Sequence, residues 1–195
     1  MELEIKSLRI FLAIPIAPDI LEALGKGVET LRETRAPVSW VRPGGMHLTV
    51  KFLGDTEPEW IAPLADSLAG ICGLIEPFPV SVAGMGAYPS LRRPRVIWAG
   101  VEELSGTLLR LHEGVDNVCA GMGWPREKRK FSPHVTVGRV KGNINLARLS
   151  AAMGEIEDEH WGDQEVMSMV LYRSHLEKGG ARYEEMRIFP FLTNQ

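Results

Sequence analysis

The sequence predicts an α+β fold with a sizeable buried core; the order of the elements indicates the class, and the composition indicates the core. Runs rich in Ile, Val, Leu and Phe, typical of strands, alternate irregularly along the chain with segments whose apolar residues recur at helical spacing. The chain has 195 residues, of which 45% are apolar and 24% charged, so it can bury a sizeable core and lacks the composition of a disordered protein. No low-complexity segment or linker stands out, so we expect residues 1–195 to form a single domain.

The first half of the chain alternates between strands and helices. The run LRIFLAIPI predicts a buried strand, and Pro18 with Asp19 begins a helix. A turn at residues 42–45 and the glycine at position 54 bound a further strand. We therefore expect strands at residues 8–16, 38–41 and 46–53, and amphipathic helices at residues 18–34 and 58–74.

The second half repeats these signals and ends in two strands. A Gly-, Pro- and Arg-rich stretch at residues 84–94 predicts a loop, as does the polar stretch at residues 121–130. Strands are expected at residues 78–82, 95–101, 134–140, 166–174 and 183–191, and helices at residues 104–119 and 144–153.

One short motif occurs twice, in both cases within a strand-like run. HLTV at residues 47–50 and HVTV at residues 134–137 each place a threonine two residues after a histidine. Five histidines and seven threonines in this chain would give roughly 0.2 such His-x-Thr triplets by chance. The repeat is therefore a candidate functional feature.

Each motif presents an imidazole and a hydroxyl on one face of its strand, because residues two apart point to the same side. If the two strands face each other, the hydroxyls of Thr49 and Thr136 can hold one anionic group between the imidazoles of His47 and His134. Histidine titrates near neutrality and serves as general acid or general base. The pattern indicates metal-independent phosphodiester cleavage, with one imidazole neutral and the other charged.

The paired motifs resemble those of the two-histidine phosphoesterases, and in particular the RNA 2′,3′-cyclic phosphodiesterases, also called 2′-5′ RNA ligases. The resemblance extends over nearly the whole chain. Tyr88 stands where this group usually has Phe. The matching runs are FLAIP, WVRP, MHLTVKFLG, GMGAYPSLRRPRVIWAG, FSPHVTVGR and SHLEKGGARY.

The resemblance implies a bilobal fold with two pseudo-symmetric lobes, each a small antiparallel sheet backed by helices, and an active-site cleft between them. It implies hydrolysis of a terminal RNA 2′,3′-cyclic phosphate to a 2′-phosphomonoester. By the same resemblance His47 is the proton donor, His134 the proton acceptor, and Thr49 and Thr136 bind the phosphate. The residues alone do not distinguish the two histidines.

Arg139 matches a position where relatives often place an arginine on the phosphate. Strict alternation along the strand would point Arg139 away from His134. The role therefore requires a twist or a β-bulge near Gly138.

The remaining candidates for chemistry are interpreted as structural. His112, His160 and His175 have no threonine two residues on, and we expect His112 at a surface or boundary. Cys72 and Cys119 lie far apart without a CxxC pattern, and no HExxH motif occurs. We expect neither a disulfide, nor a metal site, nor a cofactor.

The net charge of −3 excludes a strongly basic protein that coats nucleic acid. Basic residues nevertheless gather in the expected loops at residues 92–95 and 126–130, where they could meet RNA phosphates. Of the aromatic residues, we interpret Phe52 and Trp98 as core, while Trp40 is a candidate for base stacking.

No apolar run is long enough to span a bilayer, and the N-terminus lacks the basic start of a secretory signal. We therefore expect a cytoplasmic protein that does not bind a membrane. We further expect it to be a monomer without an obligate protein partner that acts on RNA ends or small cyclic nucleotides. The same chemistry run in reverse would join RNA ends through a 2′-5′ linkage. The alternatives are a phosphodiesterase for a small cyclic nucleotide or a 2′-5′ oligonucleotide, and a non-catalytic module that binds nucleotides or RNA.

Overall fold

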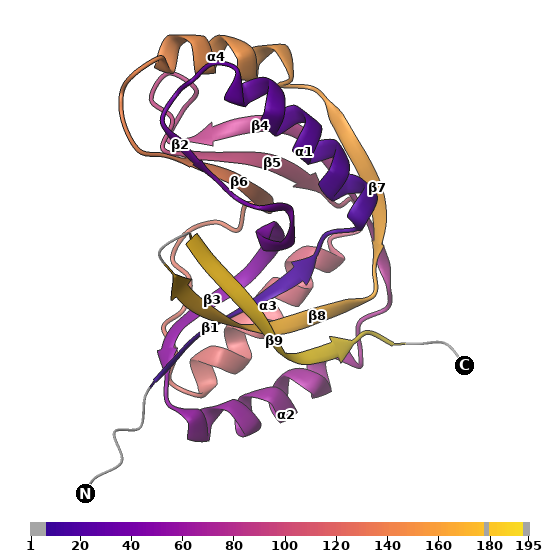
Figure 1. The fold of residues 1–195 in the computed structure, drawn as a ribbon. Helices are drawn as coiled ribbons and strands as arrows, with labels where there is room; N and C mark the ends of the chain where they lie inside the picture. The colour runs from indigo at the N-terminus through magenta and orange to yellow at the C-terminus, as the bar shows by residue number, and fades with distance from the viewer. Residues whose placement is uncertain (1–6, 178–179, 193–195) are drawn as a thin grey trace, which may run out of the picture.

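The computed structural model describes residues 7–177 and 180–192, and these form an α+β fold with two lobes (Figure 1). One lobe contains β1 (Leu8–Pro15), β3 (His47–Thr56), β8 (Ser168–Glu177), β9 (Gly180–Pro190), α2 (Ile61–Cys72) and α3 (Thr107–Gly121). The other contains β2 (Val38–Trp40), β4 (Phe78–Tyr88), β5 (Val96–Glu102), β6 (His134–Val140), β7 (His160–Val166), α1 (Pro18–Arg32) and α4 (Leu146–Glu155). Short 3₁₀ turns lie at Pro43–Gly45 and Pro58–Trp60. The predicted fold class is confirmed.

All neighbouring strands pair antiparallel, and each lobe has its own group of four in the order β7-β4-β5-β6 and β3-β1-β8-β9. The short strand β2 adds to β6. The two groups join between β3 and β6, whose register consists of one residue pair, Leu48 with Val135. A single curved sheet thus runs through both lobes, and its narrowest connection lies inside the two His-x-Thr motifs.

Helices cover the sheet on the side that the apolar residues face. Helix α1 buries Ile20, Leu24, Val28 and Leu31, which recur at helical spacing, and it packs against β7 and α4. In the other lobe α2 and α3 pack against each other, with α3 on β3 and α2 on β8 and β9. The other face of the sheet is where the motif side chains lie.

Two strand predictions need correction. Strand β4 runs on to Tyr88, where we expected a loop from residue 84, because Gly84 (φ +72°) forms a bulge within the strand and does not end it. Strand β7 was not expected, since its sequence HWGDQEV is mostly polar and buries only Trp161 and Val166. It is an edge strand, where one apolar face is enough.

Candidate active site

The two motifs meet at the junction of the lobes. Leu48 and Val135 lie opposite each other and are buried in the core. Because side chains alternate along a strand, the residues that flank this pair point to the opposite face of the sheet. Continuing the antiparallel register puts His47 across from Thr136, and Thr49 across from His134. The structure therefore brings all four predicted side chains onto one face, each of them half-buried.

His47 stands at the start of β3 within a ring of aromatic side chains. Its imidazole lies 4.8 Å from the ring of Phe11, 5.1 Å from Tyr183 and 6.2 Å from Tyr172, measured between centroids. Burial lowers the pKa of His47 to about 4, against the weaker effect of a hydrogen bond to the backbone of Gly45. The free protein therefore holds this imidazole neutral at pH 7.

His134, at the start of β6, is held by the backbone that precedes it. Its Nδ1 lies 2.7 Å from the carbonyl oxygen of Ser132. A carbonyl oxygen only accepts, so this contact assigns the proton to Nδ1 and leaves Nε2 of the neutral ring as a proton acceptor. Tyr88 meets the imidazole edge-on at 5.3 Å, and its hydroxyl is 2.9 Å from the Ser132 hydroxyl.

A bulge in β6 turns Arg139 toward the motif face. Trp98 of β5 pairs with Thr136, but Ile97 pairs with Gly138, so Val137 is the extra residue. Arg139 then follows on the same face as Thr136 and is exposed. The predicted bulge near Gly138 is confirmed. Gly138 is also closely packed, because a Cβ added at this position would lie only 2.8 Å from Cγ1 of Val38.

Strand β3 contains the matching bulge. Ala13 of β1 pairs with Thr49, but Leu12 pairs with Lys51, so here Val50 is the extra residue. Phe52 therefore takes the position in β3 that Arg139 takes in β6. The expectation that Phe52 is core is wrong, because its side chain is 68% exposed beside the ring of Phe11.

The other histidines lie elsewhere. His112 of α3 is 8% exposed, which corrects the expectation of a surface or boundary position. His160 contacts Asp163 and Ser81, and His175 contacts Glu184. Within residues 7–177 and 180–192, no cluster of three or more His, Cys, Asp and Glu side chains could hold a metal ion, and no helix is long and apolar enough to cross a membrane.

The basic loops are only partly available to a ligand. Arg126 donates to Asn117 and Asp116 of α3 and so has a structural role. The remaining basic residues of the two loops are exposed, namely Arg92, Arg93, Arg95, Lys128, Arg129 and Lys130. Trp40 lies beneath the guanidinium of Arg32, 5.8 Å from its ring centroid.

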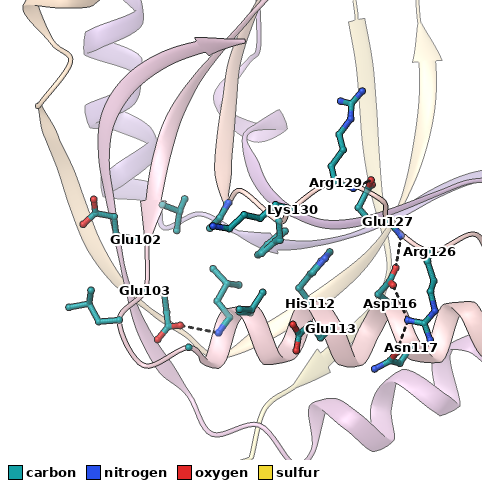
Figure 2. Close-up of a pocket in the computed structure, with 17 residues that line it drawn as sticks. Glu102, Glu103, His112, Glu113, Asp116, Asn117, Arg126, Glu127, Arg129 and Lys130 are labelled. Carbon is teal, nitrogen blue, oxygen red and sulfur yellow. Dashed lines mark hydrogen bonds and ion pairs between the residues drawn. The ribbon is translucent and has the colours of Figure 1, made fainter. Parts of the chain in front are cut away.

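A cavity of about 1010 Å³ lies between α3 and residues 126–133 and includes neither motif histidine (Figure 2). Both acidic and basic side chains line it. Among them are His112 and Asp116, which project from α3 toward the segment that leads to His134.

Comparison with known proteins connects this geometry to a family. The family model of the LigT-like phosphoesterases matches the sequence at residues 14–98 and 100–183, and each stretch contains one His-x-Thr motif. The chain belongs to this family. The predicted resemblance is confirmed, and so is the predicted class of enzyme, a phosphoesterase.

Curated relatives and solved structures resemble this chain over most of its length, in agreement with the family match. The RNA 2′,3′-cyclic phosphodiesterase of Methanothermobacter thermautotrophicus is 33% identical over 181 residues, which cover 93% of this chain and 97% of the relative. The protein of the same name from Aeropyrum pernix is 34% identical over 158 residues, or 81% and 89% of the two chains. The crystal structure of TT0787 of Thermus thermophilus superposes with a TM-score of 0.81 at 26% identity, over 94% of this chain and 98% of that one. LigT of E. coli, solved with 3′-AMP, shares the fold with a TM-score of 0.75 at 23% identity, over 96% and 100%.

Proposed function

We propose that this protein hydrolyses the 2′,3′-cyclic phosphate at the end of an RNA to a 2′-phosphomonoester. The observation that carries the proposal is the single face on which His47, Thr49, His134 and Thr136 meet. The names of the relatives from M. thermautotrophicus and A. pernix support the same activity.

In the proposed reaction His134 is the base and His47 the acid. Nε2 of His134 accepts a proton from water as the water oxygen forms a bond to phosphorus. The bond between phosphorus and O3′ breaks, and His47 donates its proton to O3′, which leaves a 3′-hydroxyl and a 2′-phosphate. Proton exchange with solvent then restores both imidazoles.

The remaining groups of the face bind the phosphate. The hydroxyls of Thr49 and Thr136 donate hydrogen bonds to the non-bridging oxygens and stabilise the charge that develops on them. Arg139, which the bulge turns to this face, supplies a positive charge at its edge. No metal or cofactor takes part, and one copy of the chain is sufficient.

Because its pKa is lowered, His47 must gain a proton before it can act as the acid in this mechanism. A proton donor must carry its proton, but burial keeps His47 neutral in the free protein at pH 7. The bound phosphodiester is an anion next to the imidazole and raises its pKa, because an opposite charge stabilises the protonated form. His47 therefore takes up its proton together with the substrate.

Two features favour an RNA end over a small nucleotide. Exposed basic residues in the loops at residues 92–95 and 128–130 offer contacts to further phosphates, and exposed Phe52 offers a surface on which a base can stack. With the 5′-hydroxyl of a second RNA as nucleophile in place of water, the same base and acid would form a 2′-5′ linkage as the bond to O3′ breaks, although water favours hydrolysis.

The test is an assay in EDTA with a short RNA that ends in a 2′,3′-cyclic phosphate. Wild type should form the 2′-phosphate, and His47→Ala and His134→Ala should each lower kcat by at least about 100-fold. His175→Ala is the matched control, since His175 pairs with Glu184 outside the motifs, and should keep its activity. RNA that wild type binds but leaves intact would contradict the proposal and favour a binding module. Cleavage of 2′,3′-cyclic AMP but not of the RNA would favour a small-nucleotide substrate.

A further inference from the structure

The position of His134 depends on the segment that precedes it, residues 122–133, which runs from α3 to β6. The Ser132 carbonyl in this segment sets the tautomer of the His134 ring. The strands of the two histidines share only the pair Leu48 with Val135, so the sheet itself holds them together weakly. Two buried contacts fasten the segment to β3, the strand of His47, and to α3.

The first contact begins at the bulge in β3. Without the bulge Lys51 would share the face of His47 and Thr49, but the extra residue turns it inward, where it is 7% exposed. There Nζ of Lys51 donates to Oδ1 of Asp116 at 2.6 Å and to the Pro125 carbonyl at 3.0 Å. The backbone N–H of residue 127 also donates to Oδ1 of Asp116, at 3.1 Å.

The carboxylate of Asp116 in this ion pair accepts hydrogen bonds from more than one donor. Burial alone would raise the pKa of Asp116, but hydrogen bonds from Lys51 and from the backbone of residue 127 hold it below its ordinary value. Asp116 therefore stays charged, and it joins α3, β3 and the 122–133 segment at one point. Figure 2 shows Asp116 with its dashed contacts to this segment.

The second contact is made by His112. Its Nδ1 lies 3.0 Å from the carbonyl oxygen of Val50, the extra residue of the bulge, and therefore donates to it. The imidazole stacks on the ring of Phe131, with centroids 4.0 Å apart and planes only 7° from parallel. His112 thus connects the bulge at Val50, the last residue of the HLTV motif, to Phe131, the residue just before Ser132.

We propose that Lys51 and His112 are positioning residues that hold the proton acceptor His134 in line with His47. They touch neither the phosphate nor the reacting atoms. They act by fixing residues 125–131, and through these the Ser132 carbonyl that orients the His134 ring. Only the expected fall in kcat rests on the proposed function. The orientation of His134 can be measured without substrate and does not depend on it.

The experiment compares Lys51→Met and His112→Phe with wild type. His112→Phe keeps a ring against Phe131 but removes the hydrogen bond to Val50, and Lys51→Met keeps the volume but removes the charge. Lys26→Met is the matched control, because Lys26 forms an exposed ion pair with Glu22 on α1. For each protein kcat and KM are measured on the cyclic-phosphate RNA, and the tautomer of His134 is read from its imidazole ¹⁵N shifts.

Both variants should lower kcat by about 10- to 100-fold, because an error of about 1 Å in a catalytic group has an effect of this size. KM should change less than kcat, since the threonines on the strands are unchanged and only the exposed basic residues at 128–130 move with the segment. In the NMR spectra the Nδ1–H tautomer of His134 should lose population, while Lys26→Met matches wild type in every measurement.

Folded variants with wild-type kcat, or a lowered kcat with an unchanged His134 tautomer, would overturn the proposal. Should Lys51→Met not fold, Asp116→Asn replaces it, because the amide keeps volume and an acceptor but loses the charge. A wild-type protein that does not cleave the RNA would refute the proposed function, and the ¹⁵N shifts would still decide whether Lys51 and His112 orient His134.

Discussion

The half-buried imidazole of His47 leads to a quantitative prediction of how the stability of the fold depends on pH. Its pKa is about 4 in the folded protein and 6.5 without the fold. Between these values the unfolded chain binds more protons, so stability falls as the pH falls below 6.5. Linkage with these two values gives a loss of about 2 kcal/mol in the free energy of unfolding from pH 7 to pH 5, and about 3 kcal/mol by pH 4.

The perturbation that isolates this contribution is His47→Gln. Urea denaturation followed by tryptophan fluorescence at pH 7, 6 and 5 gives the free energy of unfolding of wild type and variant. Wild type should lose about 2 kcal/mol more than His47→Gln over this range. Thr49→Val is the control, because it changes the same face and keeps the imidazole. A difference between wild type and His47→Gln that stays constant with pH, within about 0.5 kcal/mol, would refute the reasoning.

Three further predictions follow from the site. Binding of 2′,3′-cyclic AMP to His134→Ala at pH 7 should take up about one proton, seen by calorimetry in two buffers of different ionisation enthalpy; heats that do not depend on the buffer would argue against protonation of His47 with the substrate. Phe52→Ala should raise KM for the RNA about tenfold with little change in kcat, because stacking on an exposed ring contributes about 1–3 kcal/mol, and an unchanged KM would exclude this role. Gly138→Ala should lower the free energy of unfolding by about 1–3 kcal/mol, because the added Cβ would lie 2.8 Å from a Val38 methyl, whereas Gly121→Ala, with open space around it, should not; equal melting temperatures would contradict the packing argument.

The sequence was most informative where a local rule determines geometry. The alternation of side chains along a strand predicted that His47 and Thr49 share a face, and likewise His134 and Thr136. The same rule predicted that Arg139 needs a bulge near Gly138, and the pairing of β5 with β6 contains it. The lobed architecture came from the family resemblance, since no local pattern specifies how strands far apart in sequence pair.

The failures have physical causes as well. The glycine at position 84 is typical of a loop, but in β4 it forms a bulge that only the pairing with β5 reveals. The bulge in β3 exposes Phe52 and buries Lys51, the reverse of what their side chains predict. His112 was assigned to a surface or boundary because its partner, the Val50 carbonyl, is 62 residues away in sequence.

The most direct test of the central claim uses a substrate whose leaving group needs no acid. In a 2′,3′-cyclic phosphate with sulfur in place of O3′, the thiolate leaves without protonation, so only the base remains necessary. The account predicts that His47→Ala is inactive on the oxygen substrate but regains most of the wild-type rate on the sulfur substrate, while His134→Ala is inactive on both. Rescue of His134→Ala in place of His47→Ala, or rescue of neither, would contradict the assignment of His47 as acid and His134 as base.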